Sequence, residues 1–264
     1  MSVCIKYANL ITEEMKCLTL LLTFMALLSG AQAKALSPGS GIETDAFTTR
    51  GGHKVYIYAI KHASLRIVVD SIEIEVDPVG KLGDKVTDYA TYPKADYILV
   101  THEHGDHFDP EAIKTLTGKH TVLVTNKRCA DQLGYGVVMK NGDSKRISQL
   151  LRLEAVPAYN TTAGREKFHP KGRDNGFILS IDGLRIYVAG DTEDVPEMRV
   201  LSGIDIAFLP CNQPYTMTTE QLVHAARMVR PKILIPYHYG QTDVSDVPRQ
   251  LRPFGIEVRI RQLQ

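Results

Sequence analysis

The chain has 264 residues, which is enough for one large domain or two small ones. Its hydrophobic residues (44%) and charged residues (23%) are in ordinary globular proportion, which excludes a disordered or collagen-like chain. The formal net charge of +1 predicts no bulk attraction to nucleic acid or to anionic lipid, so any electrostatic preference for a substrate must be local.

The beginning of the chain has the three features of a secretory signal peptide. Lys16 precedes an apolar run over residues 18–28, and Ala31-Gln32-Ala33 supplies the small residues of a cleavage site. The run is shorter than the roughly 20 apolar residues that span a membrane, although an uncleaved anchor is the alternative. Two acids precede Lys16, which makes Met15 an alternative start. We predict a periplasmic or secreted protein without a stable membrane anchor.

This interpretation divides the chain into a signal peptide over residues 1–33 and one domain over residues 34–264. Two of the four cysteines lie in the signal peptide, so the mature domain keeps Cys129 and Cys211. They would lie in an oxidising compartment, but spacing alone does not place them within bridging distance. Whether they pair stays open. No Cys-x-x-Cys spacing occurs, so a cysteine zinc site is not expected.

The residue pattern of the domain favours hairpins first and alternating strands and helices later. Segments rich in Val, Ile, Leu or Tyr predict strands at 55–60, 65–69, 72–76, 97–100, 121–125, 151–156, 177–181, 185–189, 204–209 and 233–236. Capping residues predict three helices: Asp109 caps one from Pro110 to Leu116, Asn126 caps one that reaches Leu133, and Thr218 caps one that ends before Pro231. Segments 244–251 and 258–260 close the chain. The mix predicts sheets packed together with helices outside.

The strongest chemical signal is Thr101-His102-Glu103-His104-Gly105-Asp106-His107, which directly follows an apolar strand. Side chains two apart on an extended segment project to the same side, so His102 and His104 can bind one ion together. A turn at Gly105 would bring Asp106 and His107 toward a second ion. Imidazole and carboxylate suit zinc, and also iron or manganese.

The run from Asp96 to His107 resembles the His-x-His-x-Asp-His signature of the metallo-β-lactamase superfamily. Other stretches similar to that family follow the order it requires: Asp77-Pro78, Val188–Thr192, Gly203–Pro210, Tyr215–Thr218 and Ile235–Gly240. Together they most resemble the group around ascorbate-6-phosphate lactonase. The resemblance covers residues 50–255 and implies an α/β fold, the four-layer αββα sandwich, with metals at one edge on the loops that follow the strands.

The resemblance also implies a ligand set. His102 and His104 would bind a first metal, Asp106, His107 and His238 a second, and Asp191 both. Many relatives have a further first-site histidine where this chain has Asn160. A branch of the family uses a His-Pro-Lys segment, so His169 is the expected ligand. Asn160 or water is the alternative.

Several other residues are expected near the centre. Asp77 would orient a ligand histidine through a hydrogen bond. His62, Asn160 and Tyr239 are candidates for substrate contact, although His62 could equally be structural. Basic residues around His169 would favour an anionic substrate if their loop covers the metals. That loop could instead be only solvated.

The chemistry of such a site is hydrolysis. Two divalent ions would lower the pKa of a shared water toward about 7 and polarise the scissile bond. Asp106 or Asp191 would orient the hydroxide and pass a proton to the leaving group. We therefore predict a hydrolase with two zinc ions, or manganese or iron, that acts on an ester, lactone, amide or phosphodiester of a small molecule.

Three other classes remain as alternatives. An iron oxidoreductase on the same fold would use one metal and leave Asp106, His107 and His238 without a role. A nuclease would usually carry a further domain, for which this chain is too short, and its neutral charge also argues against nucleic acid. A binding protein with a dead site is disfavoured by the nearly complete ligand set. The oligomeric state stays open.

Overall fold

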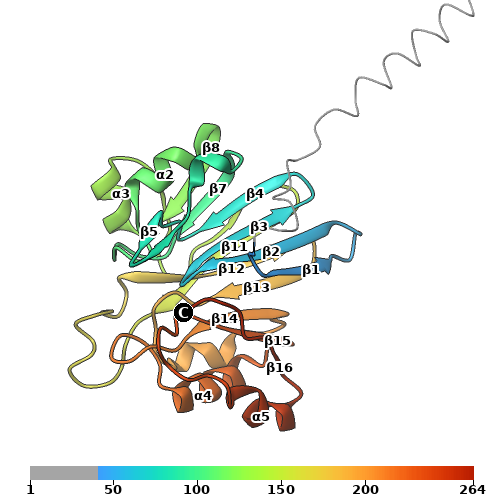
Figure 1. The fold of residues 1–264 in the computed structure, drawn as a ribbon, viewed down its shortest axis with the longest axis vertical. Helices are drawn as coiled ribbons and strands as arrows, with labels where there is room; N and C mark the ends of the chain where they lie inside the picture. The colour runs from blue at the N-terminus through green and yellow to red at the C-terminus, as the bar shows by residue number, and fades with distance from the viewer. Residues whose placement is uncertain (1–40) are drawn as a thin grey trace, which may run out of the picture. The chain divides into compact units, whose positions relative to one another are not determined.

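Two seven-stranded sheets make up the framework of residues 41–264, the part of the chain that this computed structural model describes (Figure 1). The signal peptide predicted over residues 1–33 lies outside these residues. Between residues 41 and 264, the structure contains no helix of sufficient length and hydropathy to cross a membrane.

The first sheet has the order β1-β2-β3-β4-β7-β8-β9. It is antiparallel from β1 to β4 and parallel from β4 onward, so hairpins come before crossover connections, as the pattern predicts. Its strands are β1 (Thr44–Thr48), β2 (Lys54–Lys61), β3 (Ser64–Val69), β4 (Ile72–Val76), β7 (Ala95–Val100), β8 (Thr117–Thr125) and β9 (Val137–Val138). A small separate ribbon is formed by β5 (Lys81–Leu82) and β6 (Lys85–Val86).

The second sheet has the order β10-β11-β12-β13-β14-β15-β16. Its first pairs are antiparallel, and β13 to β16 are parallel. Its strands are β10 (Ser144–Arg146), β11 (Leu151–Ala158), β12 (Asp174–Ile181), β13 (Leu184–Val188), β14 (Ile206–Pro210), β15 (Ile233–Tyr237) and β16 (Glu257–Val258).

Short helices connect these strands. The α-helices are α2 (Pro110–Leu116), α3 (Lys127–Leu133), α4 (Thr219–Val229) and α5 (Val247–Leu251), and the 3-10 helices are η1 (Tyr89–Thr91), η2 (Pro196–Val200) and η3 (Arg252–Phe254). The predicted caps are confirmed, because Asp109, Asn126 and Thr218 each accept hydrogen bonds from the first turn of a helix. Each such cap stabilises its helix by about 1 kcal/mol.

Three apolar clusters show how these elements are layered. The largest cluster combines buried side chains of both sheets, such as Ile67 and Phe177, so the sheets pack face to face. A second cluster lies between the outer face of the first sheet and α2, and a third lies between the second sheet and α4 with α5. Figure 1 shows α2 and α3 on one side and α4 and α5 on the other. The predicted four-layer αββα sandwich is confirmed.

The two cysteines of the domain are both free and buried. Cys129 belongs to the cluster under α2, and Cys211 belongs to the cluster under α4, on the other outer face of the sandwich. They therefore form no disulfide with each other. Burial raises the pKa of each thiol to about 12, so both are unreactive at neutral pH.

Candidate metal centre

The loop between β7 and α2 supplies four side chains to the centre, from His102 to His107. The amides of His107 and Phe108 both donate to the His104 carbonyl, at 2.9 and 2.8 Å, which closes the turn expected at Gly105. This turn reverses the chain, so His102 and His104 point into one group of side chains while Asp106 and His107 point into a neighbouring group.

The first group consists of His102, His104, His169 and Asp191, whose candidate ligand atoms lie within 4.8 Å of one another. The Nε2 of His102 is 3.1 Å from the Nδ1 of His104. The Nε2 of His169 is 3.3 Å from the Oδ2 of Asp191. These residues come from three distant segments of the chain, so the fold itself brings them together.

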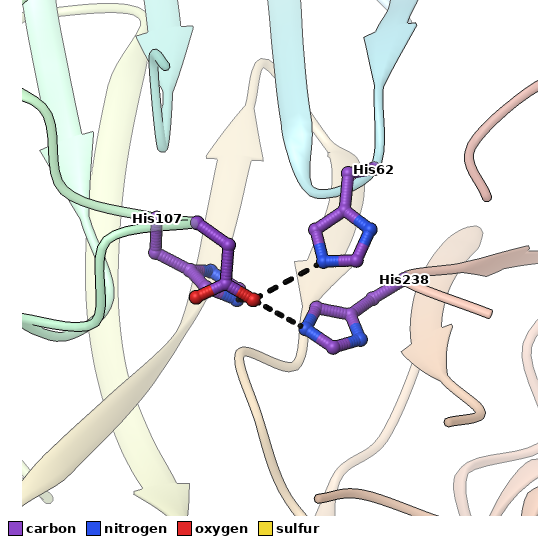
Figure 2. Close-up of side chains that lie close together, drawn as sticks. His62, His107 and His238 are labelled. Atoms are coloured by element: carbon purple, nitrogen blue, oxygen red, sulfur yellow. Dashed lines mark hydrogen bonds and ion pairs between the residues drawn. The ribbon is translucent and has the colours of Figure 1, made fainter. Parts of the chain in front are cut away.

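The second group consists of His62, Asp106, His107 and His238, again with candidate ligand atoms within 4.8 Å. The Nε2 atoms of His62 and His238 each lie 3.2 Å from the Oδ2 of Asp106. Figure 2 shows the imidazole rings of His62, His107 and His238 converging from three parts of the chain. His62 was expected at most to contact substrate, and its position in this group was not anticipated.

Asp191 lies between the two groups. Its Oδ1 is 3.1 Å from the Nε2 of His107, and its Oδ2 is 3.3 Å from the Nε2 atoms of both His238 and His169. Burial alone would raise the pKa of Asp191, but the imidazoles of His238 and His107 outweigh it and hold the pKa well below its usual range. Asp191 is therefore a charged carboxylate that faces both groups.

Two buried carboxylates fix the orientation of ligand-candidate histidines. The Oδ2 of Asp77 is 2.8 Å from the Nδ1 of His107, and Asp77 also accepts from the amide and hydroxyl of Thr101. The Oδ2 of Asp174 is 3.0 Å from the Nδ1 of His169. In each case the Nε2 of the ring is left to face the centre, as in carboxylate–histidine–metal arrangements. Asp174 was missed by sequence reasoning, although an acid five residues after His169 was visible.

Three of the six non-glycine residues with positive φ in the described part of the chain belong to the centre. His62, Asp77 and His238 have φ angles of 48°, 45° and 50°, in the left-handed region that residues with side chains seldom adopt. Such positions cost on the order of 1–3 kcal/mol each and persist where surrounding structure holds them. Here the His238 amide donates to the His62 carbonyl at 3.2 Å, which joins two of the strained residues. Strained residues cluster at functional sites.

The unpartnered polar atoms of the centre fit a cation. Within residues 41–264, the Nε2 of His107 and the Oδ1 of Asp191 are buried and lie 3.1 Å apart, but neither forms a hydrogen bond of favourable geometry with the other or with a third group. Leaving such atoms unsatisfied costs about 1–3 kcal/mol each. Burial and neighbouring imidazoles also hold the pKa of His102 well below its usual value, so its ring is neutral and can donate a lone pair. Histidine nitrogens with carboxylate oxygens suit zinc, iron or manganese.

Zinc affinity is expected to rise as the pH increases from about 6 toward 9. Burial lowers the pKa of His238, but Asp191 and Asp106 outweigh this and raise the pKa to about 9 in the metal-free protein. The proton must leave before the Nε2 binds a cation, so affinity grows until His238 is neutral. Competition against a chelator of known pH dependence measures this trend. An affinity that stays constant across the range would contradict it.

The other residues expected to contact or attract the substrate belong to neither ligand-candidate group. The amide of Asn160 donates to the Tyr215 carbonyl at 2.8 Å, and the Tyr239 hydroxyl donates to the Arg261 carbonyl at 2.6 Å. Of the four basic residues near His169, Lys167 lies over the Phe168 ring, and the other three face acids: Arg165 faces Glu193, Lys171 faces Glu197 and Arg173 faces Asp174. These carboxylates offset much of the positive charge that was expected to attract an anion.

Known proteins share both the sequence and the fold. A family model for the β-lactamase superfamily domain matches residues 56–238. A metal-dependent hydrolase of the UPF0173 group from Thermus thermophilus is 31% identical over 78% of this chain and 91% of its own length. The crystal structure of a Parabacteroides distasonis protein assigned as a metal-dependent hydrolase is 53% identical, with a TM-score of 0.81, over 84% of this chain and 100% of its own.

A further solved structure, a metallo hydrolase from Ignicoccus hospitalis, is 24% identical and has a TM-score of 0.67. The match covers 79% of this chain and 95% of that chain, and it supports the fold. The family match spans both ligand-candidate groups, from His62 in the first hairpin to His238. The chain therefore belongs to the β-lactamase superfamily and is a metal-dependent hydrolase.

Proposed function

We propose that this protein hydrolyses an ester, lactone or phosphodiester bond of a small molecule with two divalent cations, zinc being the first candidate. The observation that carries the proposal is the pair of histidine–aspartate groups that share Asp191. A shared carboxylate next to two separate donor sets is the arrangement that binds two cations close together.

The donor atoms divide between the two positions. His102, His104 and His169 would hold the first cation, and Asp106, His107 and His238 the second, with Asp191 facing both. We assign His62 to the second position as well, because its Nε2 lies as close to the Asp106 carboxylate as that of His238. The second position then has four donors of its own, of which Asp106 is the carboxylate.

Bound divalent cations would lower the pKa of a water molecule and polarise a carbonyl or phosphoryl oxygen of the substrate. The protein side chains would orient that water and exchange protons with it. The Asp106 side chain is 32% exposed, whereas that of Asp191 is 2% exposed. Asp106 is thus the carboxylate that reaches solvent and can pass a proton to a leaving group, while Asp191 stays fixed between the groups.

Two features of the sequence bear on the substrate class and on the location of the protein. The motifs shared with the lactonase group, such as Ile235–Gly240, support a lactone or a related ester. The apolar run over residues 18–28 and its Ala-x-Ala site support export through a cleavable signal peptide. An exported enzyme would meet substrates outside the cytosol, so periplasmic lactones, phosphodiesters and β-lactams belong in the assay.

The function is tested by loading the purified protein with zinc, manganese or iron and assaying a panel of lactones, phosphodiesters and β-lactams. Metal-dependent turnover of one class, lost with a chelator and restored by the metal, supports the proposal. Oxygen consumption with one iron per chain and no hydrolysis would show an oxidoreductase instead.

His169 rather than Asn160 is expected to complete the first position. The Nε2 of His169 faces Asp191, whereas the Asn160 amide is held by the Tyr215 carbonyl. His169→Ala should therefore reduce the bound metal toward one ion per chain, and Asn160→Ala should leave two. Metal content by mass spectrometry decides between them. A loss of metal in Asn160→Ala alone would reverse the assignment.

A further inference from the structure

A hollow lies away from the metal centre. It has a volume of about 1030 Å³ and is bordered by η2, the carboxyl-terminal half of α4 and the segment from η3 toward β16. Its apolar lining includes Leu201, Met228 and Ile256. None of the candidate metal ligands borders it, so the proposed function leaves this hollow without a role.

The charged residues that line the hollow are all basic. They are Arg199, His224, Arg227, Arg230 and Lys232, and the lining contains no aspartate or glutamate. Two of them have acids nearby, since Lys232 is paired with Asp205 and His224 with Asp194. The three arginines form no ion pair within residues 41–264. This is a local excess of positive charge in a chain whose net charge is only +1.

One of these arginines has an aromatic partner, and a second occupies a strained backbone position. The guanidinium of Arg227 lies 4.3 Å from the centre of the Phe254 ring, a cation–π contact that fixes its position. Arg230 ends α4 with a φ of 51°, a backbone conformation in which glycine is usual. Arg230 therefore places a guanidinium beside the hollow at a backbone position that glycine would occupy without strain.

The hollow and the metal centre are at opposite ends of one strand. Lys232 directly precedes β15 and His238 directly follows it. At about 3.3 Å per residue these two positions are roughly 20 Å apart. A small molecule in the hollow would therefore not touch the candidate metal ligands.

We propose that this hollow is a separate binding site for a phosphate ester that carries an apolar group. Guanidinium groups bind phosphate oxygens through paired, charge-assisted hydrogen bonds. The arginines would hold the phosphate, and the wall of Leu201, Met228 and Ile256 would cover the apolar part. A soluble ester or the headgroup of a phospholipid could supply this chemistry. Val200 and Phe254, exposed by 80% and 50%, lie in the segments that border the hollow and would favour a lipid source.

A competing role for the arginines is to balance the negative carboxyl end of α4, which carries about half a charge. The two roles differ in their consequences. A cation that only complements the helix stabilises the fold but does not bind an anion. Loss of melting temperature without loss of ligand binding would therefore indicate the helix role and overturn the proposal.

The test uses the chain treated with a chelator, so that phosphate cannot bind through metals. Binding of phenyl phosphate is measured by calorimetry, and binding to phosphatidylglycerol vesicles by cosedimentation, with phosphatidylcholine vesicles as the blank. The variant at the hollow, called the pocket variant, is Arg227→Gln/Arg230→Gln. The matched control is Arg146→Gln/Arg152→Gln, which removes the same charge from exposed positions on β10 and β11.

We expect the pocket variant to bind at least about ten-fold more weakly and the control variant to bind like the unmodified chain. Binding of phenyl phosphate alone identifies a soluble ester, and binding of the anionic vesicles alone identifies a lipid headgroup. Absence of binding to both probes, or equal weakening in both variants, would overturn the proposal. If the pocket variant is unstable, Arg199→Gln provides the same comparison with one charge removed. Because metal is absent throughout, these results do not depend on the proposed hydrolysis.

Discussion

Asp191→Asn is expected to remove tight binding of both cations and to abolish measurable hydrolysis. Asp191 is the one carboxylate that faces both groups, with oxygens 3.1 to 3.3 Å from the Nε2 atoms of His107, His169 and His238. An amide of the same shape lacks the charge that offsets two cations. The effect should exceed the roughly 10–100-fold loss that follows when a residue that only orients a ligand is replaced.

Metal content and the rise of melting temperature on adding zinc measure this effect. Asp194→Asn is the matched control, because Asp194 also faces a histidine, His224 at 2.5 Å, but lies outside both groups. The control should keep both ions and the zinc-induced stabilisation, which is about 2.7 kcal/mol when zinc is at 100 times its dissociation constant. Two tightly bound ions in Asp191→Asn would show that this carboxylate is not shared.

Asp77→Ala is expected to destabilise the whole domain as well as the centre. The Asp77 carboxylate is fully buried and accepts from the Thr101 amide, the Thr101 hydroxyl and the Nδ1 of His107. Removing one partner of a buried charged pair costs about 3–5 kcal/mol, a large part of the 5–15 kcal/mol that stabilises a typical domain. Urea unfolding of the metal-free chain measures this loss.

Two further variants separate stability from metal binding. Thr101→Val removes a single hydroxyl and should cost only about 1–2 kcal/mol. Asp77→Asn keeps the shape but presents an amide to the His107 ring, so it should weaken metal binding more than it weakens the fold. If Asp77→Ala were no less stable than Thr101→Val, the buried carboxylate would not be central to this part of the structure.

Much of the site was predictable because its signals are local. Helix α2 begins directly after Asp109 because that side chain accepts hydrogen bonds from the amides of the first turn. The spacing from His102 to His107 is itself a metal-binding motif. The residue pattern also predicted hairpins before strand–helix alternation, whereas the four-layer order came from resemblance to a family. The loops at Asp191 and His238 were found through resemblance to a family rather than from the residues alone.

What could not be predicted depends on long-range geometry. His62 enters the second group from the turn between β2 and β3, where its φ is 48°, directly after a pairing irregularity between Ala59 and Lys61. No local pattern marks such an irregularity. The short edge strands β9 and β10 were also missed, because strands of two or three exposed residues have no apolar alternation.

The most direct test of the central claim is the metal content of the purified protein after it is loaded with zinc and separated from free ions. The two groups of four donors, with Asp191 of the first group also facing His107 and His238 of the second, predict two zinc ions per chain. The Asp106→Ala variant, which loses a donor of the second group only, is predicted to keep one. No tightly bound ion in the unmodified chain, or a single ion that Asp106→Ala leaves unchanged, would contradict a two-metal centre.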